Sequence, residues 1–216
     1  MKEQSLELQN QLKDQVPSEI LKVFLEYAEK LGKVDFATRS RTIGDKAPEF
    51  ELLNATGELI SLKETLNNGP VVLTYYRGNW CPWCNLQLKT LQVSLLPEMN
   101  SLGANLIAIS PQTPDNSLSM KEKNELAFHV LSDQNNKVAE KYGLVFEIDK
   151  NVIKNAYNKI DLSIPFFNGT NNWKIPVTGT FVIDQNGIIQ SSYVNGDFRY
   201  RQEPLVIIEA LKKIIR

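Results

Sequence analysis

Residues 71–84 of the 216-residue chain read VVLTYYRGNWCPWC. The first six, Val71–Tyr76, are mostly β-branched or aromatic, which is typical of a strand buried on both faces of a sheet. Pro82 then favours the first turn of a helix, because its fixed φ suits that position and its missing N–H is not needed there. We therefore predict a strand-to-helix junction with Cys81 at the N-cap and Cys84 in the first helical turn.

This junction holds the only two cysteines of the chain. The free N–H groups and the dipole of a helix N-terminus favour thiolates, and the spacing puts both sulfurs on one face, close enough for a disulfide. The pattern predicts a redox pair in which both sulfurs are favoured to ionise and Cys81 is the more exposed. Two inert core cysteines are the alternative. A zinc site would need two further ligands, of which His129, the single histidine, supplies at most one, so we predict no metal and no cofactor.

From Gly44 onward the chain alternates predicted strands and helices, which indicates an α/β architecture with a mixed central β-sheet flanked by helices. Asn186-Gly187 between two apolar runs is a strong hairpin signal, and Pro97 is expected to kink or split a long helix. The predicted strands span 47–52, 59–62, 71–76, 106–110, 129–131, 180–184 and 188–194, and the predicted helices 82–102, 117–126, 138–142 and 203–216. The last helix is expected to bury Leu205, Ile208, Leu211, Ile214 and Ile215.

Residues 1–41 are predicted to form an N-terminal helical extension of a domain that spans 42–216. A weak apolar stripe runs through the first 16 residues, and a clearer helix follows Pro17 and ends at Gly32. These helices could pack on the domain, form a homodimer or contact a partner, and packing is the default expectation. Residues 144–175 are irregular and rich in Asn, which indicates an insertion.

Charge and hydropathy exclude several classes of protein. With 24 Lys and Arg against 25 Asp and Glu, the chain lacks the basic surplus of a nucleic-acid or anionic-membrane binder. The N-terminus is polar where a signal peptide would be apolar, and the longest apolar stretch, Val71–Tyr76, is far shorter than the ~20 residues that span a bilayer. We therefore expect a cytoplasmic protein that binds neither nucleic acid nor membrane.

Several segments together resemble the peroxiredoxin-like branch of the alkyl hydroperoxide reductase/thiol-specific antioxidant family. The similarity covers most of the chain and includes residues 43–50 (IGDKAPEF), 69–84, 108–113 (AISPQT), 131–133 and 180–184. The resemblance implies a thioredoxin-like fold and an oxidoreductase without a bound cofactor. Here the active-site loop carries C-P-W-C.

The resemblance also assigns places to individual residues. Members of the family carry a Pro-x-x-x-Thr-x-x-Cys motif whose cysteine attacks peroxide, and a later arginine that polarises it. In this sequence Cys84 takes the place of that cysteine, Arg77 that of the proline, Cys81 that of the threonine and Thr178 that of the later arginine. Thr178 also falls where thioredoxins have a cis-proline, whereas Trp80 before Cys81 is thioredoxin-like. The supporting residues of the site are expected to be Arg77, Trp80, Pro82, Trp83 and Thr178.

Three functions follow as hypotheses. In the first, the chain is a thiol-dependent peroxidase: Cys84 attacks hydrogen peroxide or an organic hydroperoxide, Cys81 resolves the sulfenic acid, and a thioredoxin-, glutaredoxin- or glutathione-type reductant regenerates the pair. In the second, the chain is a thiol-disulfide oxidoreductase in which Cys81 attacks a substrate disulfide. In the third, it is a non-enzymatic redox-sensing interaction protein that works through its N-terminal helices.

Several aromatic and cationic residues near the cysteines have more than one interpretation. Tyr75, Tyr76, Trp80 and Trp83 are expected as walls of the site, with core packing an equal explanation for the two tyrosines. Arg77 either stabilises charge at the site or is a solvated loop residue. Arg199 and Arg201 are expected to be a solvated charge pair, with positions that face the substrate as the alternative.

Overall fold

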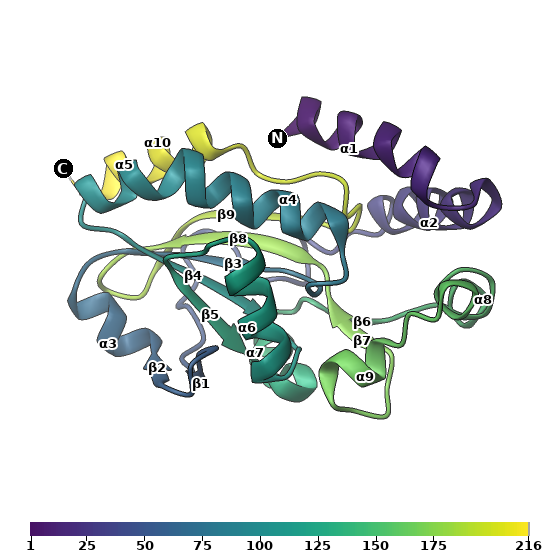
Figure 1. Cartoon of the computed structure of the whole chain (residues 1–216). Coiled ribbons are helices and arrows are strands. Elements are labelled where there is room, and N and C mark those ends of the chain that lie inside the picture. The colour runs from purple at the N-terminus through teal and green to yellow at the C-terminus, as the bar shows by residue number, and fades with distance from the viewer. Residues whose placement is uncertain (216) are drawn as a thin grey trace.

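The computed structural model describes residues 1–215. At its centre lies a five-stranded mixed sheet in the order β5-β4-β3-β8-β9 (Figure 1). The strands are β3 (Val71–Tyr75), β4 (Asn105–Ser110), β5 (His129–Ser132), β8 (Thr178–Ile183) and β9 (Ile189–Asn195). Because β3 pairs in parallel with β4 and antiparallel with β8, the strand that leads into the cysteines is the central one. The predicted α/β architecture with a mixed sheet flanked by helices is confirmed.

Both faces of the sheet are covered, which explains why every residue of β3 is buried. Leu73 and Tyr75 point into one apolar cluster and Val72 into the other, as the two-residue repeat of a strand requires. The first cluster includes residues of α2, α3 and α7, and the second includes residues of α4, α5, α6 and α10. The bounds of the helices on the domain are α3 (Leu62–Asn67), α4 (Pro82–Thr90), α5 (Leu96–Ser101), α6 (Pro114–Lys123), α7 (Lys137–Lys141, preceded by the 3-10 turn η2, Gln134–Asn136) and α10 (Pro204–Ile214).

The helix predicted over 82–102 is split, as Pro97 led us to expect. A π-helical segment, η1 (Leu91–Leu95), joins α4 to α5, and Pro97 lies in the first turn of α5. Proline has no N–H for the carbonyl four residues earlier, so the hydrogen-bond pattern has to change just ahead of it.

Two hairpins are present, one formed from the predicted strands at 47–52 and 59–62 and one at the predicted Asn186-Gly187 turn. The first consists of β1 (Glu51–Leu53) and β2 (Leu59–Ser61), and in the second Gly187 supplies a φ of 77° in the turn between β8 and β9. The expected apolar face of the last helix is wrong in part, because Leu205 and Ile215 are 74% and 40% exposed and Ile207 is buried. At 100° per residue Leu205 lies about 200° around α10 from Ile207, so the two cannot share a buried face. Arg216, the last residue of the predicted helix, lies outside the described residues.

The N-terminal extension consists of α1 (Lys2–Gln15) and α2 (Ser18–Gly32) and packs on the domain. In Figure 1, α1 lies beside the end of α4 that carries the cysteines. The α-amino group of Met1 pairs with Glu203 at 2.9 Å, and the Ser5 hydroxyl donates to the Arg199 carbonyl at 2.8 Å. The default expectation for these helices, packing on the domain, is confirmed, whereas the domain boundary at residue 41 stays a prediction.

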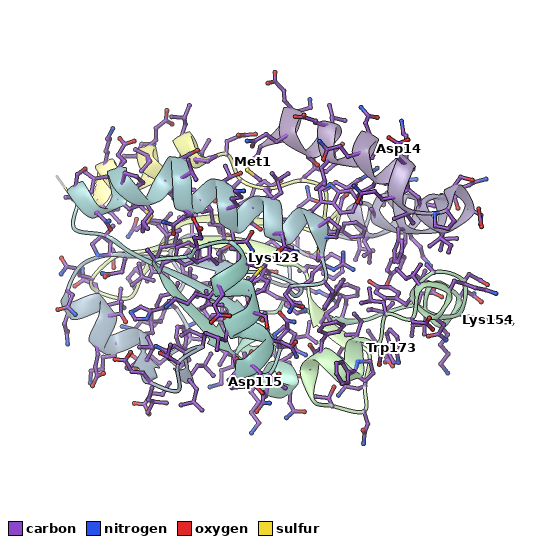
Figure 2. The ribbon with its side chains drawn as sticks, in the orientation of Figure 1. Met1, Asp14, Asp115, Lys123, Lys154 and Trp173 are labelled. Carbon is purple, nitrogen blue, oxygen red and sulfur yellow. The ribbon has the colours of Figure 1, made fainter. Side chains whose placement is uncertain are left out.

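The 144–175 segment is more regular than its sequence suggests. It contains the antiparallel strands β6 (Val145–Glu147) and β7 (Lys174–Pro176), and between them the short helices α8 (Lys150–Asn155), η3 (Tyr157–Ile160) and α9 (Ile164–Asn168). An ion pair of 3.0 Å between Lys30 and Asp149 ties it to α2. Trp173, labelled in Figure 2, packs edge-to-face against Tyr157 with ring centroids 5.6 Å apart. The ion pair joins the insertion to the N-terminal extension, and a hydrogen bond of 3.1 Å from the Asn136 side chain to the Lys174 carbonyl joins it to the domain.

Within residues 1–215, no helix has the length and apolar character needed to cross a membrane.

Candidate active site

The two cysteines lie where the sequence predicted, in the first turn of α4 directly after the loop that follows β3. Cys81 is the N-cap residue, with φ −90° and ψ 113°, and its carbonyl accepts hydrogen bonds from the N–H groups of Cys84 (3.0 Å) and Asn85 (3.1 Å). Both thiols are free and buried. Cys81 is the more accessible of the two, as expected, but the margin is small, with 1% of its surface accessible against 0% for Cys84.

The loop before Cys81 is held by amide side chains. Gln112 accepts the Asn79 N–H and donates to the Asn79 side chain, both at 2.8 Å. The Asn85 side chain donates to the Asn79 carbonyl at 2.7 Å. At Gly78, an added Cβ would lie 2.2 Å from Nε1 of Trp80, so only glycine allows the indole to fold against this loop. These contacts fix the loop that positions Arg77 beside the sulfurs.

The surroundings of Cys84 favour its thiolate. Its Sγ accepts the backbone N–H of Arg77 and the Nη2 of Arg201, each at 3.5 Å. Burial opposes the charge, but a hydrogen bond from the Cys81 thiol, the guanidinium groups of Arg201 and Arg77 and the Arg77 N–H outweigh it and lower the pKa of Cys84 to about 5. Cys84 is therefore ionised at neutral pH.

Cys81 behaves in the opposite way. Burial, together with the hydrogen bond to Cys84 and the negative charge there, raises the pKa of Cys81 well above its ordinary value. The sequence-based expectation that both sulfurs are favoured to ionise is therefore wrong. Ionising both of two adjacent thiols is unfavourable because the two negative charges repel each other. In addition, the Cys81 side chain accepts no hydrogen bond from the free N–H groups of the helix. The pair consists of a thiolate and a neutral thiol that donates to it.

Arg77 is buried, so the solvated reading of this residue is wrong. Its Nη2 donates to the Tyr157 hydroxyl at 2.6 Å, and its guanidinium carbon lies 4.1 Å from the centre of the Phe198 ring and 5.0 Å from that of Trp80. Burial raises the pKa of Tyr157 to about 12, so its hydroxyl stays neutral and accepts from the cation. The positive charge of Arg77 is thus kept inside the site by neutral and aromatic partners.

Arg201 belongs to the site, a position that the sequence analysis gave only as the alternative. It is buried, and besides Cys84 it donates through Nε to Gln87 Oε1 at 2.6 Å and through Nη1 to the carbonyls of Phe198 and Tyr200. No sequence signal separates it from Arg199, two residues earlier, which instead pairs with Asp197 at 2.7 Å. The solvated reading is wrong for Arg201, because the loop between β9 and α10 turns its side chain under α4.

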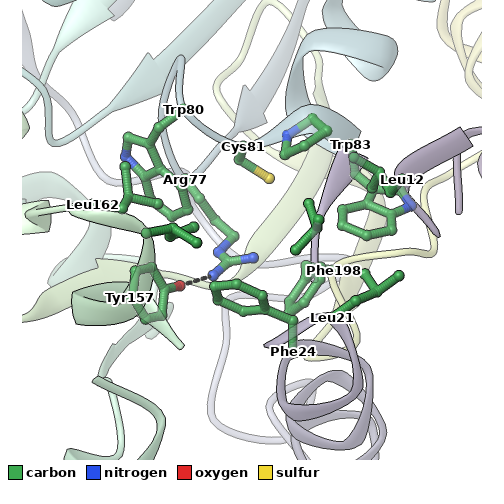
Figure 3. Close-up of a pocket in the computed structure, with 13 residues that line it drawn as sticks. Leu12, Leu21, Phe24, Arg77, Trp80, Cys81, Trp83, Tyr157, Leu162 and Phe198 are labelled. Atoms are coloured by element: carbon green, nitrogen blue, oxygen red, sulfur yellow. Dashed lines mark hydrogen bonds between the residues drawn. The ribbon is translucent and has the colours of Figure 1, made fainter. Parts of the chain in front are cut away.

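A pocket of about 110 Å³ opens onto Cys81 (Figure 3). The sulfur of Cys81 points into it, and the guanidinium of Arg77 lies beside it. Its walls are mainly apolar and come from four parts of the chain: the extension (Leu12, Val16, Leu21, Phe24), the loop and start of α4 (Arg77, Trp80, Cys81, Pro82, Trp83), the insertion (Tyr157, Ile160, Leu162) and Phe198. The extension and the insertion therefore close the space above the cysteines.

The remaining predicted site residues divide into two groups. Trp80, Pro82 and Trp83 line the pocket as expected. Tyr75 and Tyr76 are core residues that do not line it, and Thr178 uses its hydroxyl to donate to the Asn195 carbonyl at 3.4 Å. Among residues 1–215, no hydrogen bond joins Thr178 to either sulfur.

In the part of the chain that the structure describes, no three His, Cys, Asp or Glu side chains lie close enough together to bind a metal ion.

The fold and the site define the class of protein: a thioredoxin-like α/β domain of the peroxiredoxin type, with a thiol pair at the first turn of the helix after the central strand. The AhpC/TSA family profile matches residues 43–192, and the chain belongs to this family.

Named relatives agree with this assignment. "Peroxiredoxin Q, chloroplastic" of Oryza sativa subsp. japonica is 28% identical over 171 residues, which cover 78% of this chain and 67% of the relative. The protein of the same name from Sedum lineare is 26% identical over 174 residues, covering 79% and 80%.

Solved structures show the same fold. Peroxidoxin BcpB from Mycobacterium tuberculosis superimposes with a TM-score of 0.62 at 21% identity, over 80% of this chain and 97% of that one. Peroxiredoxin Q from Xanthomonas campestris gives a TM-score of 0.60 at 16% identity, over 77% and 92%.

Proposed function

We propose that the chain is a thiol peroxidase that reduces hydrogen peroxide or organic hydroperoxides, with Cys84 as the attacking thiolate and Cys81 as the resolving thiol. The observation that carries the proposal is the setting of the Cys84 sulfur, which accepts from the Arg77 N–H and from the Arg201 guanidinium at 3.5 Å each. An ionised sulfur with a neutral thiol beside it is what peroxide reduction followed by disulfide formation requires.

The proposed reaction has three steps: oxidation of Cys84, formation of the disulfide, and its reduction. The Cys84 thiolate bonds to the terminal oxygen of the hydroperoxide, the O–O bond breaks, and the departing alkoxide takes up a proton to leave as an alcohol. Cys84, now a sulfenic acid, is attacked by the Cys81 sulfur, and water leaves as the disulfide forms. A thiol reductant of the thioredoxin, glutaredoxin or glutathione type then reduces the disulfide, and is itself oxidised.

The size of the pocket favours a small oxidant. About 110 Å³ accommodates a few waters or one small organic molecule, whereas a disulfide in another protein could not enter. The names of the relatives, both peroxiredoxins, support a hydroperoxide as that oxidant. We further propose that the protein acts in the cytoplasm.

A second function is favoured by one observation: the sulfur that lines the pocket is that of Cys81. In a thiol-disulfide oxidoreductase Cys81 would attack a small disulfide and pass its proton to Cys84, which would later resolve the mixed disulfide. The two functions assign the first attack to different sulfurs and can be separated on that ground.

The experiment compares wild type, Cys84→Ser and Cys81→Ser, with hydroperoxide consumption measured and the products identified by mass spectrometry. We expect Cys84→Ser to consume no hydroperoxide and Cys81→Ser to consume a single equivalent and stop as a sulfenic acid. Each variant is the matched control of the other, since both replace one sulfur by oxygen in the same turn. Loss of the first oxidation in Cys81→Ser, with no hydroperoxide consumed by wild type, would reject the peroxidase and support disulfide exchange.

A further inference from the structure

The guanidinium of Arg77 lines the pocket above Cys81 and has N–H groups to spare. Its Nη2 donates to the Tyr157 hydroxyl at 2.6 Å, whereas its Nε is buried without an acceptor, and within residues 1–215 no hydrogen bond is made by Nη1. In Figure 3 a guanidinium nitrogen on the side away from Tyr157 points into the space that the drawn side chains surround. A cation with free donors at the wall of a pocket is suited to bind an anion there.

The site carries more positive than negative charge. Arg77 and Arg201 are both buried, and among residues 1–215 neither forms an ion pair with Asp or Glu. The Cys84 thiolate compensates one of these two charges. A disulfide is uncharged, so oxidation of the cysteine pair leaves both guanidinium charges without an anion. Because an uncompensated buried charge is costly, the oxidised site favours the entry of an anion.

Access and leaving-group chemistry both make Cys81 the sulfur at which the disulfide is reduced. Cys81 lines the pocket, whereas Cys84 does not. Attack on Cys81 expels Cys84, and a thiol with a pKa of about 5 is a better leaving group than an ordinary thiol. The Arg77 N–H and the Arg201 guanidinium are in place to accept the returning charge on Cys84. The reductant therefore has to reach Cys81 through the pocket.

The size and the walls of the pocket define which thiol can enter. Its volume is about 110 Å³, and Leu12 of α1 and Phe24 of α2 form part of its wall, so a thiol on the surface of a protein would first have to displace the extension. Among the lining residues within 1–215, Arg77 is the only cation and no carboxylate is present. The pocket thus matches a small thiol with an apolar body and one negative charge.

We propose that the pocket above Cys81 is the binding site of the reductant, a low-molecular-weight thiol that carries a carboxylate, and that Arg77 binds this carboxylate while the thiol attacks Cys81. The inference deepens the proposed function and rests on it, because it needs the disulfide that peroxide reduction forms. Of the reductants that the proposed function allows, it selects a small molecule over a protein.

Reduction of the disulfide consumes two molecules of the thiol. The first, as a thiolate, bonds to the Cys81 sulfur, and the disulfide bond breaks with its electron pair leaving on Cys84 as a thiolate. The second, also as a thiolate, bonds to the outer sulfur of the mixed disulfide, and the Cys81 sulfur leaves and takes up a proton. The two thiols depart as one disulfide and have supplied two electrons.

The test measures how fast small thiols reduce the disulfide form of the full-length protein, with free thiols alkylated and counted by mass spectrometry. The disulfide is prepared with hydrogen peroxide and, separately, with diamide. Three thiols of similar size are compared: mercaptopropionate, which carries a carboxylate, mercaptopropanol, which is uncharged, and cysteamine, which is cationic. Each rate is expressed per thiolate and corrected for thiolate basicity with a coefficient of about 0.4–0.5.

The comparison is made for wild type, Arg77→Met and a matched control, Arg39→Met. Arg39 also lies over an aromatic ring, 4.2 Å from the centre of Phe36, but it does not line the pocket. In wild type we expect mercaptopropionate to react about 10- to 100-fold faster than mercaptopropanol, and cysteamine to be the slowest. Arg77→Met should lose most of this preference, and Arg39→Met should keep it.

Equal rates for mercaptopropionate and mercaptopropanol in wild type overturn the proposal. This comparison needs no variant, so it decides the matter even if Arg77→Met does not fold. An undiminished preference in folded Arg77→Met, or an equal loss in Arg39→Met, also overturns it.

A protein reductant tests the choice of a small thiol. We expect Leu12→Ala to accelerate reduction by thioredoxin at least about tenfold more than reduction by mercaptopropionate, because only the protein needs α1 to move. Fast reduction of wild type by thioredoxin, with no gain in Leu12→Ala, overturns the proposal. Failure of the proposed function is distinguishable, because then hydrogen peroxide does not form the disulfide. Diamide still forms it in that case, and the order of the three rates still decides whether the pocket binds an anionic thiol.

Discussion

We predict that the N-terminal helix α1 controls access to the cysteines and that removing one of its side chains opens the site. Leu12 is 7% exposed and forms part of the wall above Cys81. Neither cysteine has more than 1% of its surface accessible, so a reagent larger than the pocket can react only after part of the wall moves away. Val16 and Pro17 separate α1 from α2, so we expect α1 to detach by rotation at these two residues.

The size of the effect follows from what Leu12 buries. Replacing a buried leucine by alanine costs about 2–5 kcal/mol, and because Leu12 borders an existing cavity we take the lower part of that range, about 2–3 kcal/mol. The substitution destabilises only the closed state, in which α1 packs on the domain. At about 1.4 kcal/mol for each factor of ten, the population with α1 detached rises about 30- to 140-fold. When closing is faster than the chemistry, the reaction rate of the thiols rises by the same factor.

The assay is the rate at which a bulky aromatic disulfide reagent modifies the reduced protein. We expect Leu12→Ala to react about 30- to 140-fold faster than wild type by the population argument above. Leu6→Ala is the matched control, because Leu6 lies on the same helix but is 56% exposed; its rate should stay within about twofold. Leu211→Ala removes the same atoms from a fully buried site in α10 and controls for loss of global stability. An unchanged rate in Leu12→Ala, or an equal increase in Leu211→Ala, would refute the gating by α1.

Two further predictions concern the charges of the site. Because the pKa of Cys84 is lowered from 9.0 to about 5, the unfolded chain binds more protons than the folded chain between pH 5 and pH 9. The stabilisation that the Cys84 thiolate gives the fold is fully present above about pH 9 and is lost as pH falls toward 5. In urea denaturation of the reduced protein the free energy of unfolding should therefore rise with pH across this window relative to Cys84→Ser, and parallel curves would contradict the thiolate assignment. Tyr157→Phe removes the acceptor at 2.6 Å from Arg77 and leaves a buried cation short of a partner, which should cost about 1–3 kcal/mol in the same assay. Tyr200→Phe, at an exposed position, should cost less than about 0.5 kcal/mol, and equal losses would contradict this role of Tyr157.

Local patterns in the sequence predicted the elements around the site well. The apolar run at 71–76 became the central strand, Cys81 became the N-cap of α4, and Asn186-Gly187 became a hairpin turn. Each of these outcomes depends on residues within a few positions of one another, where backbone preferences and capping act directly. The family resemblance also identified the fold, because its motifs are spread along most of the chain.

Predictions that needed distant contacts were less successful. Leu205 fits an apolar stripe, yet it lies off the buried face of α10. Thr178 occupies the place of the family's arginine in sequence order, but its hydroxyl bonds to Asn195 instead of approaching the cysteines. A guanidinium does reach the Cys84 sulfur, from a position 117 residues later in the chain. A residue that far away leaves no periodicity or spacing from which its contact could be predicted.

The amino-acid sequence by itself determined that two thiols share the first turn of one helix, directly after a strand buried in a mixed sheet, because strand burial and proline at a helix start are local properties. Only the tertiary structure decided which of the two is the thiolate. That depends on Arg77 and Arg201 being buried beside Cys84 and on α1, α2 and the insertion covering Cys81. The energy of a charge is determined by everything packed around it, and folding brings those groups together from across the whole chain.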